Sequence, residues 1–377
     1  MDFKPLAQFI DSITSWRIPW AEVVVMHRNE TVFRYRKGYA NLEEKLPIDD
    51  RRIFNLYSLT KIMTCTAALQ LVEKGAMLLS DPISLYLPEY AEMTVQTILP
   101  NGEFAMENAE RPITVRDLFT MSAGFSYDLE VPSFQDVIER TNGRVPTRDF
   151  AAALAKEPLL FEPGTRWNYS LCHDILAALV EVVDGRRFGS YIRDEITGPL
   201  GMNDTGFDLT EEQRTRLAPQ YEFSDELNRP LRKDGNGYRI GSEFESGGAG
   251  LLSTVSDYIL FLNALTHRGT SPKGVRILSP ASVELMRTDH LTEHMRSDFS
   301  WEHLDGYGYG LGVRTLVSKS RSGSLSPLGE FGWSGAAGCL AIIDPDSQLT
   351  VMYAQHLLNN QEPYVHPRLK NIVYACL

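Results

Sequence analysis

A nearly uncharged segment begins at Ser58, and Lys61 is its only charged residue as far as Gln70. Apolar residues recur on every side of a helix with 3.6 residues per turn, so the segment predicts a helix that passes through the protein core. Burying a lysine is costly unless another group uses its charge. The fold must therefore surround this helix and provide partners for one ammonium group.

The spacing of Ser58 and Lys61 gives that ammonium group a use. Residues three apart lie on one face of a helix, with Cβ atoms about 5–6 Å apart, so Lys61 can reach the Ser58 hydroxyl. Removing an amine from water favours its neutral form, which can act as a base. Free backbone N–H groups at the helix N-terminus also favour a developing negative charge. A helix-capping serine beside a lysine that extends to solvent fits the same residues, so this motif alone leaves both interpretations open.

Composition narrows the class of protein. The chain has 377 residues, enough for one large domain or two of ordinary size, and 43% of them are hydrophobic. A formal net charge of −12 without any basic run argues against nucleic acid or an anionic membrane as a partner. The N-terminal residues do not resemble a signal peptide and no window approaches about 18 apolar residues, so we expect a cytoplasmic protein. The four cysteines are widely spaced, and we expect no disulfide framework, metal or cofactor.

Strand patterns lie near both ends of the chain, at residues 21–26, 31–37, 338–343 and 349–355. Helical patterns near residues 6–13 and 368–375 flank them. We therefore expect an α+β fold with one central antiparallel sheet. Residues 1–81 and 245–377 would form this α/β domain, and residues 82–244 would form an inserted, mostly helical domain, with the active site between the two.

Two further segments accompany the Ser58-x-x-Lys61 motif. Residues 161–170, FEPGTRWNYS, predict a turn that leads into a helix, and residues 331–338, FGWSGAAG, are a glycine-rich approach to a strand. In order and spacing these segments resemble the serine β-lactamase-like superfamily, in particular its class C β-lactamase and D,D-peptidase branch and the family VIII carboxylesterases. The resemblance covers nearly the whole chain. It implies a β-lactamase/transpeptidase-like fold, with an antiparallel sheet flanked by helices.

The resemblance also implies a role for each matching residue. Ser58 would be the acylated nucleophile, and Lys61 would lower the cost of removing its proton. Tyr169 would share the base role and return the proton to the leaving group. A phenol can do this only beside a cation, which Lys61 would supply. The backbone N–H groups of Ser58 and Ala336 would form the oxyanion hole.

The chain departs from the penicillin-recognising members at two positions. Their Tyr-x-Asn motif is Tyr169-Ser170-Leu171 here, and the Leu171 side chain cannot form hydrogen bonds. Their Lys-Thr-Gly strand motif is Trp333-Ser334-Gly335, so an aromatic ring replaces a cation. Both departures point away from an anionic amide, and we expect hydrolysis of short-chain or aryl carboxylic esters. The alternatives are a β-lactamase or D-amino-acid peptidase or amidase of the same fold, and an acyltransferase.

The sequence says less about the substrate pocket than about the catalytic residues. The expected substrate is a small-molecule ester or amide, and the sequence indicates no oligomeric state. Segments that surround the active site in relatives suggest these substrate-binding residues: Trp333, Ser334, Gly335, Phe125, Tyr127 and Tyr309. Trp301 and Tyr307 lie in similar segments, and core packing explains each aromatic residue equally well. His173 lies one helical turn beyond Tyr169, and we expect it to pack in the core.

Overall fold

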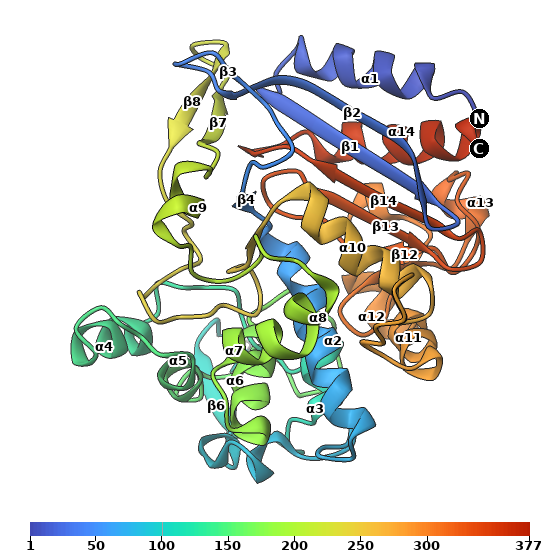
Figure 1. Cartoon of the computed structure of the whole chain (residues 1–377). Helices are drawn as coiled ribbons and strands as arrows, with labels where there is room; N and C mark the ends of the chain where they lie inside the picture. Colours follow the sequence, from blue (N-terminus) through green and yellow to red (C-terminus); the bar gives the residue numbers. More distant parts are fainter. Residues whose placement is uncertain (100) are drawn as a thin grey trace.

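An eight-stranded antiparallel sheet dominates the computed structural model, which describes residues 1–99 and 101–377 (Figure 1). Its strand order is β10-β11-β12-β13-β14-β1-β2-β3. The bounds are β1 Trp20–His27, β2 Glu30–Asn41, β3 Leu46–Pro47, β10 Tyr307–Tyr309, β11 Arg314–Leu316, β12 Phe331–Gly332, β13 Leu340–Asp344 and β14 Leu349–Ala354. Strand β14 pairs with β13 on one side and with β1 on the other. Strands from both ends of the chain therefore share one sheet, as the sequence predicted.

Alternating side chains of the central strands face two separate hydrophobic cores. On β1, Val23 and Val25 pack in a core with helices α1 and α14, whereas Val24 packs in the core that contains α2 and α10. The period of two places these helices on opposite faces of the sheet (Figure 1). Their bounds are α1 Lys4–Thr14, α2 Thr60–Glu73, α10 Val255–Thr266 and α14 Glu362–Cys376.

Helix α2 runs through the core, as its uncharged sequence predicted. A 3-10 turn, Tyr57–Leu59, leads into it, and every residue of the helix from Thr60 to Leu71 is buried. The chain leaves the helix at Gly75, whose φ of 66° is in the left-handed region that glycine adopts easily. The Lys61 side chain is buried with the rest, and its relative exposure is 0%.

Residues 82–244 are mostly helix and loop, but they also contain two β-hairpins that the sequence did not predict. The hairpins are β5 Thr94–Ile98 with β6 Phe104–Asn108, and β7 Gln220–Ser224 with β8 Arg229–Lys233. The helices are α3 Val115–Phe119, α4 Pro132–Arg140, α5 Thr147–Leu154, α6 Cys172–Asp184, α7 Phe188–Ile192, α8 Gly198–Leu200 and α9 Glu211–Thr215. Strand β7 also pairs in parallel with β15, Leu357–Leu358, and so connects this region to the C-terminal part of the chain.

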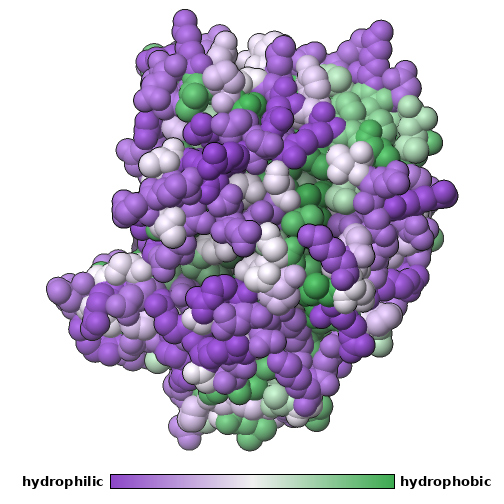
Figure 2. Space-filling view, viewed as in Figure 1, coloured by the Kyte–Doolittle hydropathy of each residue, from purple (hydrophilic) through white to green (hydrophobic). Residues whose placement is uncertain are grey.

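The remaining strands form a separate pair, and three further helices lie in the C-terminal half of the chain. They are β4 Phe54–Asn55, β9 Leu252–Ser253, α11 Pro280–Arg287, α12 Glu293–Asp298 and α13 Lys319–Ser322. The face drawn in Figure 2 is mostly hydrophilic, and hydrophobic side chains reach it in narrow strips and at its margins. In the described part of the chain, no helix combines the length and the apolar character needed to cross a membrane.

Candidate active site

Ser58 lies in the middle of the 3-10 turn that precedes α2. The residue before it, Tyr57, has a φ of 48°, which non-glycine residues seldom adopt. Burial and a hydrogen bond from the Tyr57 hydroxyl to the side chain of Gln220 hold this conformation. The turn thereby presents the Ser58 side chain to a cavity at the N-terminal end of α2.

The ammonium group of Lys61 has three hydrogen-bond partners. It donates to Ser58 Oγ at 3.3 Å, to the Tyr127 hydroxyl at 3.2 Å and to the carbonyl oxygen of Gly248 at 2.7 Å. An ammonium group has three N–H donors, so this set uses all of them. The nitrogen also lies 4.6 Å from the centre of the Tyr169 ring, within cation–π distance. These contacts hold the buried lysine against the serine.

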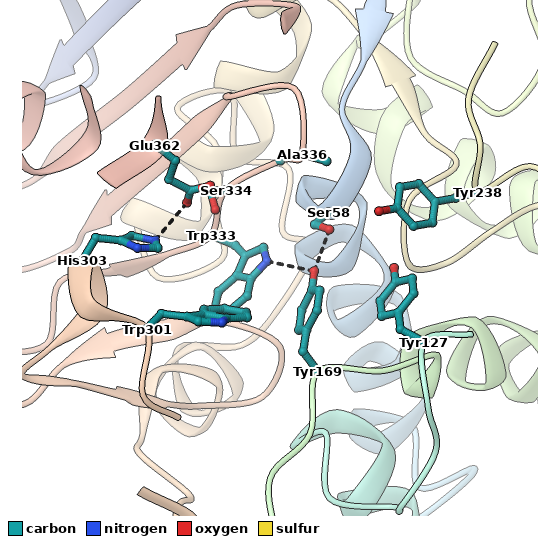
Figure 3. A pocket seen from close by; sticks show the side chains of 11 residues that line it. Ser58, Tyr127, Tyr169, Tyr238, Trp301, His303, Trp333, Ser334, Ala336 and Glu362 are labelled. Carbon is teal, nitrogen blue, oxygen red and sulfur yellow. Dashed lines mark hydrogen bonds and ion pairs between the residues drawn. The ribbon is translucent and has the colours of Figure 1, made fainter. Parts of the chain in front are cut away.

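Tyr169 contacts the serine from a second direction. Its hydroxyl donates to Ser58 Oγ at 2.6 Å and accepts a hydrogen bond from Trp333 Nε1 at 3.3 Å (Figure 3). Ser58 therefore has two neighbours, Lys61 and Tyr169, that can exchange a proton with it.

A buried carboxylate supports Lys61 through the 247–250 loop. Asp174, in the first turn of α6, accepts hydrogen bonds from the Ser246 hydroxyl at 2.5 Å and from the Gly248 N–H at 3.1 Å. Burial raises the pKa of Asp174, and the charge of Lys61 opposes that shift. A Cβ atom on Gly248 would lie 2.6 Å from an Asp174 oxygen, so glycine is needed where the loop contacts the carboxylate and the lysine together.

The segment after β12 brings a further backbone N–H group to the cavity. A Cβ atom on Gly335 would lie 2.3 Å from the carbonyl oxygen of Leu56, so this segment passes directly against the turn that carries Ser58. The Gly335 N–H donates to the carbonyl of Cys339 at 2.9 Å. The next N–H, that of Ala336, has no protein acceptor among the described residues and lines the same cavity as Ser58.

The cavity has a volume of about 440 Å³ and a largely aromatic wall. Its lining residues are Ser58, Tyr127, Tyr169, Tyr238, Trp301, His303, Trp333, Ser334, Gly335, Ala336 and Glu362. In Figure 3 the Trp301, His303 and Glu362 side chains lie on one side of Ser58, whereas Tyr127 and Tyr238 lie on the other. A ligand at Ser58 would therefore contact aromatic rings in both directions.

The structure brings most of the predicted site residues together. Those that line the cavity or touch Ser58 are Ser58, Lys61, Tyr169, Ala336, Trp333, Ser334, Gly335 and Tyr127. Phe125 and Tyr309 do not reach the cavity, contrary to expectation, because both are buried behind it. Phe125 packs against Tyr90, and the Tyr309 ring packs edge-on against the ring of Trp333, 5.3 Å between centres.

Three neighbouring residues also have packing rather than cavity positions. Leu171 is buried at the start of α6, and the Tyr307 hydroxyl contacts buried Glu330 and Lys370. His173 is buried as well, and its Nε2 lies 3.2 Å from the carbonyl oxygen of Phe119. Burial and the charge of Lys61 lower the pKa of His173 to about 3, against the raising effect of that carbonyl.

Sequence reasoning missed three cavity residues, Tyr238, His303 and Glu362. Tyr238 lies in a loop, His303 in a short 3-10 turn and Glu362 at the start of α14, and no motif marks any of them in the sequence. Trp301, which the sequence left undecided, also lines the cavity. Among the residues that the structure describes, no three His, Cys, Asp or Glu side chains gather in an arrangement that could hold a metal ion.

Comparison with known proteins shows the family of the chain. The family model described as Beta-lactamase matches residues 6–374. The chain belongs to the β-lactamase family. It is thus a serine hydrolase of the serine β-lactamase-like superfamily, with the β-lactamase/transpeptidase-like fold that the sequence predicted.

Individual relatives cover most of the chain. Protein Rv1367c of Mycobacterium tuberculosis is 33% identical over 88% of this chain and 84% of its own length. Esterase EstB of Burkholderia gladioli is 25% identical, over 92% of this chain and 88% of its own. The solved structure of EstCE1, described as a hydrolase with promiscuous acyltransferase activity, has a TM-score of 0.79 at 24% identity and covers 98% of this chain and 97% of its own.

Proposed function

We propose that this protein hydrolyses carboxylic esters through an acyl-enzyme on Ser58. The observation that carries the proposal is the convergence of Tyr169 and Lys61 on Ser58 Oγ, at 2.6 and 3.3 Å, at an aromatic cavity. A serine is a weak nucleophile until a neighbouring group takes its proton. Such a group must lie within about 2.6–3.2 Å of the hydroxyl. Tyr169 meets this distance, and Lys61 lies just beyond it.

In the acylation step, Ser58 Oγ attacks the ester carbonyl carbon while its proton passes to the phenolate of Tyr169. Tyr169 must give up its own hydroxyl proton before it can act as this base, and Lys61 and the Trp333 N–H are the neighbours that would stabilise the resulting anion. The backbone N–H groups of Ser58 and Ala336 stabilise the carbonyl oxygen as it becomes negative. The bond from carbon to the alcohol oxygen then breaks, Tyr169 returns the proton to the departing alkoxide, and the acyl group remains on Ser58.

In the deacylation step, water takes the place of the alcohol. Tyr169 accepts a proton from the water as its oxygen attacks the acyl carbon, and the same two N–H groups stabilise the second oxyanion. The bond from Ser58 Oγ to the acyl carbon breaks, and Tyr169 returns the proton to the serine. A carboxylic acid leaves, and the enzyme returns to its starting state.

The cavity wall favours an ester over an anionic amide. Trp333 stands where the penicillin-recognising members of the family hold a cation, and in the described part of the chain no lysine or arginine lines the cavity. The Glu362 carboxylate lines it and would repel a substrate carboxylate. Because an alkoxide leaves more easily than an amide nitrogen, an ester needs fewer polar anchors than a peptide.

We further propose that the site lies between two domains, residues 1–81 with 245–377 and residues 82–244. Both parts of the chain supply the cavity wall, since Ser58 and Trp333 belong to the first and Tyr169 belongs to the second. This origin of the wall supports the division, although β7 pairs with β15 across it.

Acyl transfer to an alcohol is the second candidate function. The description of EstCE1 as a hydrolase with promiscuous acyltransferase activity favours it. The chemistry is shared up to the acyl-enzyme, after which an alcohol attacks instead of water. Adding a short alcohol to a hydrolysis assay distinguishes the two, because transfer forms a new ester at the expense of the free acid.

The test of ester hydrolysis uses p-nitrophenyl butyrate and four variants. We expect Ser58→Ala to abolish release of nitrophenol. Tyr169→Phe and Lys61→Met should each lower kcat about 10²–10⁴-fold, the usual contribution of a general base. Tyr238→Phe is the matched control, since it removes a cavity phenol that is not bonded to Ser58, and its loss should be far smaller.

Intact-protein mass spectrometry provides the second readout. Wild type stopped during turnover should carry one butyryl group, and Ser58→Ala should carry none. Hydrolysis that persists in Ser58→Ala would contradict the proposal. Faster turnover of nitrocefin than of every ester tested would instead favour the β-lactamase alternative.

A further inference from the structure

Glu362 places a carboxylate at one end of the cavity, and the proposed acylation chemistry does not use it. The residue opens α14 and lines the cavity beside Ser334 and His303 (Figure 3). Its Oε1 atom lies 3.3 Å from His303 Nε2 and 3.3 Å from His366 Nδ1. Burial raises the pKa of Glu362, but His366, His303 and Ser334 more than offset this effect, and the pKa lies well below its ordinary range. Glu362 is therefore ionised at neutral pH.

The contacts of Glu362 leave part of the carboxylate for a ligand. A carboxylate accepts up to about four hydrogen bonds; both imidazoles approach the same oxygen, and the Ser334 hydroxyl is one further partner. The His366 ring is also held on the side away from Glu362, because its Nε2 contacts the carbonyl oxygen of Gly338 at 3.0 Å. The Glu362 side chain keeps 20% of its surface exposed. A ligand group in the cavity can therefore meet an anion that is already held in place.

Aromatic rings surround the same end of the cavity. Trp301 and Trp333 have ring centres 5.9 Å apart, and each lies within 5.7 Å of the Tyr169 ring centre. Trp301 is 38% exposed, so its ring has surface available for a ligand. Aromatic faces attract ammonium groups, and tryptophan does so most strongly. A carboxylate beside such rings is a chemical environment that selects cations.

We propose that Glu362, Trp301 and Trp333 form a subsite for a cationic group, so that the enzyme prefers esters of amino alcohols, including quaternary ammonium alcohols. The inference rests on the proposed ester hydrolysis. The cation belongs to the alcohol because Tyr169, which returns the proton to the alcohol, is hydrogen-bonded to Trp333 on this side of Ser58. The acyl group then lies toward Tyr127 and Tyr238, on the other side.

The test compares three butyrate esters at pH 8.5 by kcat/KM. Butyrylcholine carries a cation, 3,3-dimethylbutyl butyrate has the same shape with carbon in place of nitrogen, and the butyrate ester of 4-hydroxybutanoate carries an anion. We expect wild type to prefer the choline ester to its neutral analogue roughly tenfold, as a cation–π contact and a nearby carboxylate together provide. The anionic ester should be the poorest substrate.

Three variants then locate the origin of the preference. Glu362→Gln should lower the ratio of choline ester to neutral ester severalfold, leaving only the part that the Trp301 and Trp333 rings provide, and Glu362→Asp should keep more of it. Glu302→Gln is the matched control, because it makes the same change at an exposed glutamate between Trp301 and His303 that does not itself line the cavity, and it should keep the wild-type ratio. Each ratio is measured within one variant, so a partly unfolded sample does not alter it.

An equal rate for the cationic and neutral esters, with both depending on Ser58, would overturn the cationic subsite alone. Failure to hydrolyse any of the three esters would overturn the proposed function as well.

Discussion

Trp333 contributes a hydrogen bond rather than a charge at its position. Its indole N–H donates to the Tyr169 hydroxyl oxygen at 3.3 Å, and Trp333→Phe removes this donor while it keeps a ring. One hydrogen bond contributes about 0.5–1.5 kcal/mol, so kcat for p-nitrophenyl butyrate should fall roughly two- to tenfold with little change in KM. Steady-state kinetics measure both constants.

Trp167 offers a control of the same chemistry nearby. It packs against Tyr169, with ring centres 6.3 Å apart, and its buried Nε1 has no hydrogen-bond partner in the described part of the chain. Trp167→Phe therefore removes an N–H that does not donate to the Tyr169 hydroxyl. An equal loss of kcat in Trp167→Phe and Trp333→Phe would show that the ring, and not the N–H of Trp333, matters to Tyr169.

Single residues differ in how far the sequence could predict their place in the site. Helical spacing alone brings Lys61 to Ser58, and the observed contact of 3.3 Å agrees with it. Tyr169 lies 111 positions from Ser58 in the chain, so only resemblance to a family could pair them. Glu362 and His303 meet through packing of two separate segments, and no local pattern encodes a contact of that kind.

At the level of elements, the close passage of the 333–336 segment over the Ser58 turn is the most constrained feature. Gly335→Ala would place a Cβ atom 2.3 Å from the Leu56 carbonyl oxygen, so the segment must move away from Ser58. Ala336 would move with it, and loss of one oxyanion-hole donor lowers kcat about 10²–10³-fold. Ester kinetics and the thermal midpoint of unfolding together measure the effect.

Gly237→Ala is the matched control for this prediction. Gly237 also lies in a loop, but a Cβ atom there would meet nothing within 4 Å. Its activity and thermal midpoint should stay close to those of wild type. Full activity in Gly335→Ala would show that the position of Ala336 relative to Ser58 does not control the reaction.

The predicted elements were accurate where buried side chains give the sequence a clear pattern of apolar residues. The hairpin of β1 and β2 and the pair β13 and β14 were predicted, since their apolar runs face the two cores. The β5–β6 hairpin was missed because its apolar side chains are largely exposed, as at Ile98 and Phe104, and lack that pattern. Helix α14 begins six residues before the predicted start, since Pro363 fits its first turn and Pro367 is tolerated inside it.

For the molecule as a whole, two buried histidines tie folding to pH. His173 and His356 are both buried, and their burial lowers the pKa values to about 3 and about 4, from an ordinary value of 6.5. Below pH 6.5 the unfolded chain binds protons at these positions that the folded chain does not. The free energy of unfolding is therefore fully retained above pH 6.5 and falls as the pH decreases toward 4, by roughly 1.4 kcal/mol per pH unit for each histidine.

Urea unfolding at pH 7 and pH 5 measures this dependence. The wild-type midpoint should be clearly lower at pH 5, and His173→Gln or His356→Gln should each reduce the difference between the two pH values. His294→Gln, at an exposed position, should keep the full difference. Buried carboxylates such as Asp174, whose raised pKa acts in the opposite direction, are common to all four proteins and cancel in the comparison. Equal pH dependence in His294→Gln and both buried-histidine variants would mean that neither imidazole couples protonation to folding.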